Sequence, residues 1–222
     1  HPMAEDAKEA TGSMGDDTPL AVLSNKYRPL YHFFRQNFSQ VTNPPIDSLR
    51  ENKVMSLKTR FGNLGNILDF NNLTEENIYV LNSPILTNNQ FEKFVSFFDK
   101  NNKTIDCTFN SDENIESKLN SIKQEAEIYV RQGVTQIILS DKNVSKENYP
   151  VPMLLCIGAV HTHLTKMKLR GYVSINVQTG EALDTHSFAT LIGVGATTVN
   201  PYLALDSLYQ RFEKKLFGKY LY

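Results

Sequence analysis

Beyond residue 77, short segments rich in β-branched residues alternate with longer segments whose apolar residues recur at helical spacing. This alternation predicts a parallel sheet, because each helix must carry the chain back across a face of the sheet before the next strand begins. The predicted strands are residues 77–81, 103–109, 134–140, 172–178 and 197–200, and the predicted helices are residues 87–100, 114–133, 151–169, 185–193 and 202–217. We therefore expect an α/β fold of parallel β/α repeats, arranged as an open sheet or as something like half of a barrel.

Residues at the helix ends support these boundaries. Thr87 or Asn88 is expected to cap the first of the helices, and Gly133 is expected to close the second. The glycines of "GVGATTVNP" follow the fourth helix, and they have neither the G-x-G-x-x-G spacing nor the preceding strand of a phosphate-binding loop. We interpret them as a helix stop with close backbone packing.

The segment before residue 77 has a different character. Leu30, Phe33, Phe34 and Phe38 are spaced as one apolar face of a helix over residues 29–40. The two prolines of "VTNPP" cannot continue that helix, and a second short helix is expected near "SLRENKVMS". This part of the chain is therefore predicted to be a helical arm with rigid corners.

Together these patterns predict a single domain over residues 1–222. An N-terminal loop and helical arm cover residues 1–66, and the β/α core covers residues 77–222. A chain of this length buries about 70% of its unfolded surface, which is enough for a substantial core.

Composition excludes several classes of function. The net charge is −1 and the lysines are scattered, so we expect no nucleic-acid partner. The longest apolar stretch, "VPMLLCIGAV", is far shorter than the roughly 20 residues that span a bilayer, and the first residues are unlike a signal peptide, so we expect a soluble, intracellular protein without a membrane partner. Cys107 and Cys156 are too few for a disulfide framework, a zinc site or an iron-sulfur cluster, and are expected to be buried free thiols.

The strand ends that precede helices are the natural place for function. In parallel β/α folds these ends lie on one edge of the sheet, where ligands usually bind. The candidates at this edge are Pro84, Ser140, Asp141, Thr179, Glu181 and Asn200. Glu181 and His186 form either an acid/base or hydrogen-bonding couple, or a helix cap and its partner.

Other combinations of reactive residues are incomplete. His161 and His163 form an H-x-H pair, but their segment has helical spacing, so the two side chains point in different directions and no metal site is expected. The sequence has no G-x-S-x-G motif, no Walker motif and no cysteine next to a base. Spacing alone therefore reveals no complete active site.

Six blocks of sequence carry a specific resemblance. They are "PMAEDAKEATGSMGDDTPLAVLS", "YHFFRQNFSQVTNPPIDSLRE", "GVTQIILSD", "PMLLCIGAVHTHL", "TGEALDTHSFATLIGVGA" and "VNPYLA". In this order the blocks resemble the central domain of the large chain of glutamate synthase. The resemblance runs from near residue 2 to about residue 205.

The resemblance implies a larger enzyme. In that family an amidotransferase domain releases ammonia from glutamine, and an FMN barrel with an iron-sulfur cluster combines the ammonia with 2-oxoglutarate and reduces the imine to glutamate. The α/β central domain joins these two partner domains and helps to wall the ammonia tunnel. We therefore expect no cofactor within these residues, FMN and an iron-sulfur cluster in the parent enzyme, and a location in the cytoplasm or the plastid stroma.

The resemblance also places a constriction of the tunnel. It implies that Met14 and Thr42 line the narrow point, with Asn43 as a neighbour, in the stretches "GSMGDD" and "VTNPP". Uncharged thioether, hydroxyl and backbone groups suit a path for neutral ammonia, because they hold no proton or cation on the way. The alternative is that the glycines of "GSMGDD" only shape a turn and an aspartate caps the next segment.

The sequence departs from the family pattern at three positions. Thr162 and Ser187 stand where histidines often occur, and Val194 stands where tyrosine is usual, which weakens any role for the histidines in shared chemistry. The central domain would act by contacts with its neighbours, and the candidates for these contacts are Asp141, Glu181, His186 and Asn200.

The sequence is also compatible with two other classes of function. One is a free-standing α/β enzyme, or a metal-dependent hydrolase with a metal at the H-x-H pair, that uses Asp141, Glu181 and His186. The other is a non-catalytic sensor of small molecules built on the same sheet.

Overall fold

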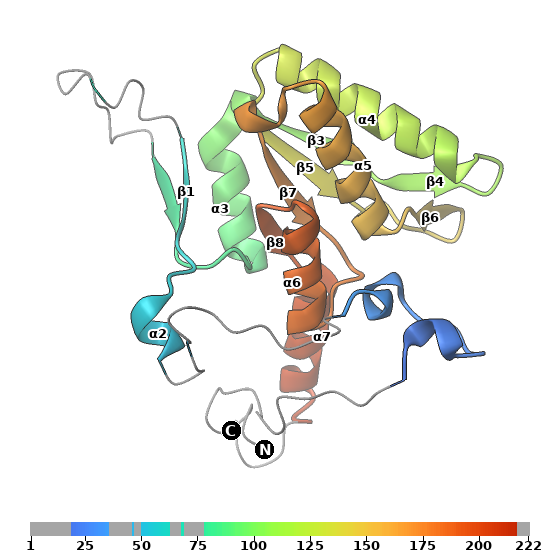
Figure 1. Ribbon diagram of the computed structural model, residues 1–222. Helices are drawn as coiled ribbons and strands as arrows, with labels where there is room; N and C mark the ends of the chain where they lie inside the picture. The colour runs from blue at the N-terminus through green and yellow to red at the C-terminus, as the bar shows by residue number, and fades with distance from the viewer. Residues whose placement is uncertain (1–18, 36–45, 47–49, 63–67, 69–77, 217–222) are drawn as a thin grey trace.

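The core is a four-stranded parallel sheet (Figure 1). The computed structural model describes residues 19–35, 46, 50–62, 68 and 78–216. The strands are β3 (Asn102–Asp106), β5 (Gln136–Ser140), β7 (Ser174–Gln178) and β8 (Thr198–Asn200), in the order β3-β5-β7-β8. All three pairings are parallel. The predicted parallel α/β fold is therefore confirmed, and the sheet is open within the described residues.

The connecting helices lie on one face of this sheet. They are α4 (Ile115–Arg131), α5 (Met153–Lys166) and α6 (Thr185–Val194), and α5 contacts both of the others. Because each crossover moves the chain to the next strand in the same direction, right-handed connections place all three helices on the same side. The helix α3 (Asn88–Phe98) lies on the opposite face (Figure 1). One-sided helices on consecutive parallel strands are the arrangement of half a barrel.

Two apolar cores follow from this layout. Ile137, Leu139, Ile175 and Val177 face α4, α5 and α6, and they belong to the larger core. The smaller core surrounds Ile138 on the other face. Its other members are Phe61, Leu81, Leu86, Phe91, Phe94 and Phe98. The rings of Phe61, Phe94 and Phe98 pack against one another edge-on or tilted, with centroids 5.0 to 6.2 Å apart, an arrangement that favours aromatic pairs.

The segment 77–81 was predicted to join the parallel series, and that placement is wrong. Its described part, β2 (Tyr79–Leu81), pairs with β1 (Thr59–Phe61) in an antiparallel two-stranded sheet. The chain then turns and runs beside β8, where Ile85 forms a parallel bridge with Val199. The strand itself is correctly predicted, but periodicity does not identify its partner.

The segment 103–109 was predicted as one strand and is two. The strand β3 ends at Asp106, whose Oδ1 accepts hydrogen bonds from the backbone N–H and the hydroxyl of Thr108 at 2.9 and 2.8 Å. This turn redirects the chain, so that β4 (Thr108–Asn110) pairs antiparallel with β6 (Asn148–Pro150).

The N-terminal arm is less helical than predicted. It holds the 3₁₀ turns η1 (Ala21–Leu23) and η2 (Leu30–Phe33) and the short helix α2 (Glu51–Val54). The helix expected over residues 29–40 is wrong in its described part, because Phe34 is extended with φ −100° and ψ 107°. Tyr31, and neither Phe33 nor Phe34, is the buried aromatic residue of η2.

The two helix ends that were predicted from capping residues are confirmed. Thr87 and Gln90 form a reciprocal capping box at the start of α3. Gly133 closes α4 with φ +89°, a conformation that favours glycine. Further elements are η4 (Asp99–Asn101), η5 (Arg170–Tyr172) and α7 (Tyr202–Glu213). Within the described residues, every helix is too short or too polar to cross a membrane.

Candidate functional site

The carboxyl edge of the sheet brings the six predicted edge residues together. Ser140 and Asn200 end β5 and β8, and backbone hydrogen bonds continue past the strands. The N–H of Asp141 donates to the Gln178 carbonyl at 3.2 Å, and that of Thr179 donates to the Asn200 carbonyl at 3.0 Å. The N–H of Val199 likewise donates to the carbonyl of Pro84 at 2.8 Å, and Glu181 follows in the loop after β7.

Asp141 is a buried carboxylate that holds the loop after β7. It accepts hydrogen bonds from the Thr179 hydroxyl at 2.5 Å and from the Gly180 N–H at 3.0 and 3.1 Å. Burial raises the pKa of Asp141, against the opposing effect of these donors. The Tyr202 hydroxyl also bonds to this carboxylate, and its own pKa is raised by burial and by the charge of Asp141.

Glu181 serves as the side-chain cap of α5. Pro152, which precedes this helix, offers no capping side chain, and Glu181 Oε2 instead accepts a hydrogen bond from the Met153 N–H at 2.9 Å. The same oxygen accepts one from the Tyr31 hydroxyl at 3.4 Å. Burial, and to a lesser extent the charge of Asp141, raise the pKa of Glu181.

His186 and Glu181 are joined through the arm and not to each other. A ring nitrogen of His186, Nε2, lies 2.9 Å from the carbonyl oxygen of Tyr31, while Glu181 contacts the hydroxyl of the same tyrosine. Among the described residues no hydrogen bond or ion pair links the imidazole to the carboxylate. Glu181 is therefore a helix cap, as one of the two sequence-based alternatives has it, but it caps α5 and bonds to Tyr31, and His186 is not its direct partner.

Tyr31, which no sequence pattern singles out, joins the arm to this edge of the sheet through its hydroxyl and its carbonyl. Its side chain is buried, and burial followed by the charge of Glu181 raises its pKa. The two partners are 150 positions apart in the chain. Local periodicity carries no signal for such a pairing.

Two rows of hydrogen-bonded side chains cross the sheet on the side of α3. In the first row Asn176 Nδ2 donates to Gln136 Oε1 at 3.1 Å, and the Thr198 hydroxyl donates to Asn176 Oδ1 at 2.8 Å. In the second row the Ser140 hydroxyl donates to Gln178 Oε1 at 2.9 Å, and Gln178 Nε2 donates to Asn200 Oδ1 at 3.3 Å. These rows use the hydrogen-bonding capacity of the buried polar groups within the protein.

A pocket of about 340 Å³ opens between α3, α7 and this edge. Its floor includes the apolar side chains of Phe91 and Ile138, and its polar lining includes Lys142, Gln178 and Asn200. Asn200 Nδ2 is already bonded to the Leu86 carbonyl and to Asn88. The amides of Gln178 and Asn200 at this pocket therefore act first as supports of the fold.

His161 and His163 lie on α5, as predicted, and have separate partners. His163 Nε2 lies 2.6 Å from Glu127 Oε2, and this hydrogen bond joins α5 to α4. His161 Nδ1 accepts a hydrogen bond from the Arg170 guanidinium at 3.1 Å. A Cβ at Gly195 would lie 2.6 Å from this imidazole, which explains the helix-stop glycine by close packing. In the part of the chain that the structure describes, no group of three or more metal-ligating side chains comes together.

The three predicted tunnel residues, Met14, Thr42 and Asn43, lie outside the described residues. The two cysteines, Cys107 and Cys156, are buried free thiols as expected.

Comparison with known proteins identifies the family. A family model described as the glutamate synthase central domain matches residues 1–220. The chain belongs to the glutamate synthase central domain family. The resemblance found in the sequence is thereby confirmed, and the family assignment covers the arm as well as the β/α core.

Relatives in this family are whole glutamate synthases. The chain is 55% identical over 221 residues to the glutamate synthase (NADPH) large chain of Azospirillum brasilense. It is 42% identical over 217 residues to the corresponding chain of Bacillus subtilis, and 42% identical over 221 residues to the chloroplastic ferredoxin-dependent glutamate synthase of Spinacia oleracea. These alignments cover 98%, 96% and 94% of this chain. They cover only 14%, 14% and 13% of the relatives, so in those proteins the domain is a small part of a longer chain.

Proposed function

We propose that this chain is the linking domain of a glutamate synthase, which joins a glutamine amidotransferase domain to an FMN-binding synthase domain. The supporting observation is the family match over residues 1–220, together with relatives about seven times longer that are themselves glutamate synthases. In the parent enzyme, ammonia from glutamine would combine with 2-oxoglutarate, and FMN with an iron-sulfur cluster would supply the electrons that reduce the imine to glutamate. The parent would work in the cytoplasm or in a plastid.

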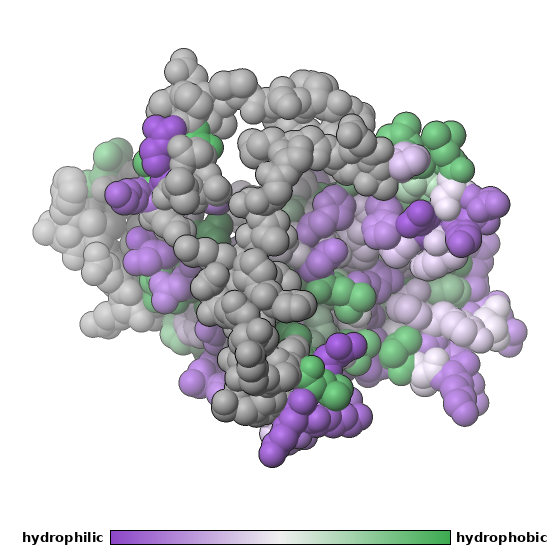
Figure 2. Space-filling view, turned by 90° about the horizontal axis from the view of Figure 1, so that it is seen from below, coloured by the Kyte–Doolittle hydropathy of each residue, from purple (hydrophilic) through white to green (hydrophobic). Residues whose placement is uncertain are grey.

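The surface of the arm supports a linking role. Leu20, Val22, Leu23 and Tyr27 are all exposed, with 48% to 90% of each residue accessible. In the view from below in Figure 2, hydrophobic residues form small separate patches between hydrophilic ones. Side chains of this size gain about 1.5 to 3 kcal/mol each when they become buried, so contact with neighbouring domains would cover them favourably.

The finer part of the proposal is that Met14 and Thr42 narrow the path of ammonia, with Asn43 beside them. The path has to pass neutral ammonia, because the ammonium ion is not a nucleophile. The edge residues Asp141, Glu181, His186 and Asn200 would then hold the shape of the domain and its contacts, and no step of the chemistry is assigned to them.

The test uses the full-length parent enzyme with Met14→Trp or Thr42→Trp. A bulky ring in the path should leave glutamine hydrolysis running while glutamate formation from glutamine falls. Parallel assays of hydrolysis and of glutamate formation measure this coupling. Ammonium added to the medium should still support glutamate formation, which would exclude damage to the synthase site.

Met55→Trp is the matched control, because Met55 is an exposed methionine of the arm. The same assays should find its coupling unchanged. Coupling that stays at the wild-type level in both Met14→Trp and Thr42→Trp would refute a constriction at these residues. Tight binding of FMN by the 222-residue chain alone would contradict the linking role itself.

A further inference from the structure

A second pocket, distinct from the one beside α3, lies between the arm and the start of α6. It has a volume of about 270 Å³ and is lined by residues that come from both sides of η2. The lining residues are Pro19, Ala21, Arg28, His32, Phe34, Arg35 and His186. Four of these seven side chains are basic and none is acidic.

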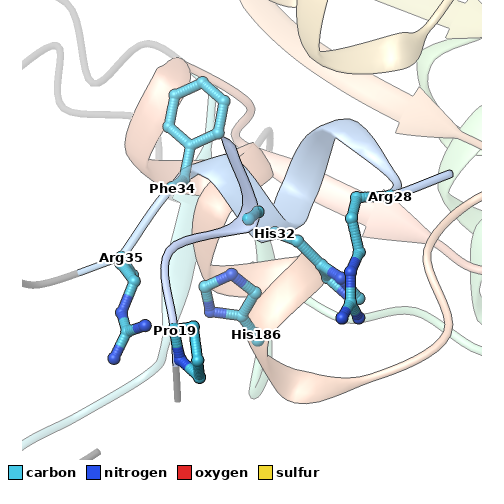
Figure 3. Close-up of a pocket in the computed structure, with 7 residues that line it drawn as sticks. Pro19, Arg28, His32, Phe34, Arg35 and His186 are labelled. Atoms are coloured by element: carbon cyan, nitrogen blue, oxygen red, sulfur yellow. The ribbon is translucent and has the colours of Figure 1, made fainter. Parts of the chain in front are cut away.

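The basic groups surround the pocket from different directions. Figure 3 shows Arg28 and His32 on one side, Arg35 and Pro19 on the other, and the ring of His186 between them. His186 is held in place, because its Nε2 lies 2.9 Å from the Tyr31 carbonyl, which leaves Nδ1 for another partner. Among the described residues, no hydrogen bond or ion pair occupies the Arg28 guanidinium.

Asp184, an acidic residue at the start of α6, does not line the pocket, although its charge acts on the pocket residues His186 and His32. Asp184 caps α6, and its Oδ1 accepts hydrogen bonds from the N–H and the hydroxyl of Ser187 at 2.8 and 2.5 Å. Its carboxylate therefore satisfies the helix and does not line the cavity. Among the described residues, the pocket lining itself therefore carries only basic groups, with the single carboxylate of Asp184 behind its histidines.

From this arrangement we infer that the pocket binds an organic carboxylate. The guanidinium of Arg28 matches the two oxygens of a carboxylate, and an imidazole adds a further hydrogen bond. Pro19, Ala21 and Phe34 give the pocket apolar walls, which favour an anion with a carbon skeleton over inorganic phosphate. The volume is slightly below the range of sites for drug-sized molecules and suits a ligand with few carbon atoms.

The carboxylate has two possible sources. It is either a free small molecule or an aspartate or glutamate side chain from another part of a longer parent chain. This inference is independent of the ammonia path, so its failure leaves the proposed function untouched.

The first experiment is a calorimetric titration of the 222-residue chain with succinate, with succinamide and with inorganic phosphate, after a thermal melt shows cooperative unfolding. Succinamide has nearly the same shape as succinate but no charge. We expect saturable binding of succinate, no binding of succinamide, weaker binding of phosphate, and a loss of affinity as salt is added.

Variants then locate the site. Arg28→Gln should weaken succinate binding about tenfold, because it removes a charged hydrogen-bond donor. His32→Gln is a second variant at an exposed position, and Arg211→Gln, on the exposed side of α7, is the matched control that should bind like the wild type. Equal binding of succinate and succinamide, no saturable binding of succinate, or wild-type affinity in both pocket variants would overturn the proposal.

A titration of the full-length parent chain separates the two sources. If the ligand is a free small molecule, the binding of succinate that depends on Arg28 should persist there. If a carboxylate of another domain occupies the pocket, the succinate binding that depends on Arg28 should disappear in the parent chain, while it remains in the 222-residue chain.

Discussion

The two faces of the parallel sheet are held in different ways. On the face covered by α4, α5 and α6, the strands present aliphatic side chains such as Ile137 and Ile175, which pack without specific partners. On the face of α3, the same strands present Gln136, Asn176 and Thr198, which are joined by hydrogen bonds across the sheet. Apolar side chains are stabilised by any close packing, because their contacts have no required direction. A buried amide group instead needs a hydrogen-bond partner at one particular position. The first face therefore supplies stability, and the hydrogen bonds of the second specify which side chains lie next to one another across the sheet.

The largest expected effect is on the apolar face. Ile175→Ala should lower the free energy of unfolding by about 2 to 5 kcal/mol, because a fully buried side chain is lost and a cavity remains. Urea denaturation measures this change. Ile128→Ala, at a half-exposed position of α4, makes the same chemical change and should cost less than about 0.5 kcal/mol. Equal costs at the two sites would remove the basis of the comparison.

An intermediate effect is expected on the polar face. Asn176→Leu leaves Gln136 Oε1 and the Thr198 hydroxyl without a partner, so it should cost about 1 to 3 kcal/mol although it adds apolar volume. Urea denaturation should also show that Thr198→Val recovers part of this loss in the double variant, because one unpaired group is removed. Asn110→Leu, an exposed asparagine of β4, is the control and should be nearly neutral. A stabilised Asn176→Leu protein would mean that this row is dispensable.

The two faces also explain what the sequence predicts well. Helices such as 114–133 and the strand 134–140 were predictable because their periodicity and their end signals, such as Gly133, are local. The same locality made the edge residues predictable as a group, since strand order alone brings them to one rim. The family itself was recognisable from six blocks of sequence.

The failures share a physical cause, which is dependence on distant partners. Phe33 and Phe34 have helical spacing, but the arm places Tyr31 in the core and leaves those two rings partly exposed. A single short helix without a packed face is marginal, so tertiary contacts decide its conformation. The hydrogen bond between Tyr31 and Glu181 spans 150 positions, and the basic pocket beside it has no sequence motif. Met14 and Thr42 remain predictions from the resemblance.

The smallest expected effect is the change in stability with pH that comes from the carboxyl group of Glu181, at the edge of the sheet where the two faces meet. Glu181 caps α5, which belongs to the apolar face, and burial raises the pKa of this carboxyl. The folded protein therefore binds the proton more tightly than the unfolded chain does. The stability that depends on this proton is fully present below the unfolded pKa of about 4.3 and is lost as the pH rises through the higher folded value.

Glu181→Gln keeps an oxygen that can accept from the Met153 N–H but has no charge to bury. The difference in unfolding free energy between this variant and the wild type should shift in favour of the variant as the pH rises from about 4 to about 7, and urea denaturation at several pH values measures it. Asp141, whose pKa is also raised, is present in both proteins, but its charge acts on Glu181, so the difference reports the burial of Glu181 together with its repulsion from Asp141. A difference that stays constant with pH, or that shifts toward the wild type, would mean that Glu181 is ionised at little cost. The capping hydrogen bond would then stabilise the ionised form of Glu181 by more than burial destabilises it. In its effect on a charged group, the edge of the sheet would resemble a solvated surface more than the two apolar cores.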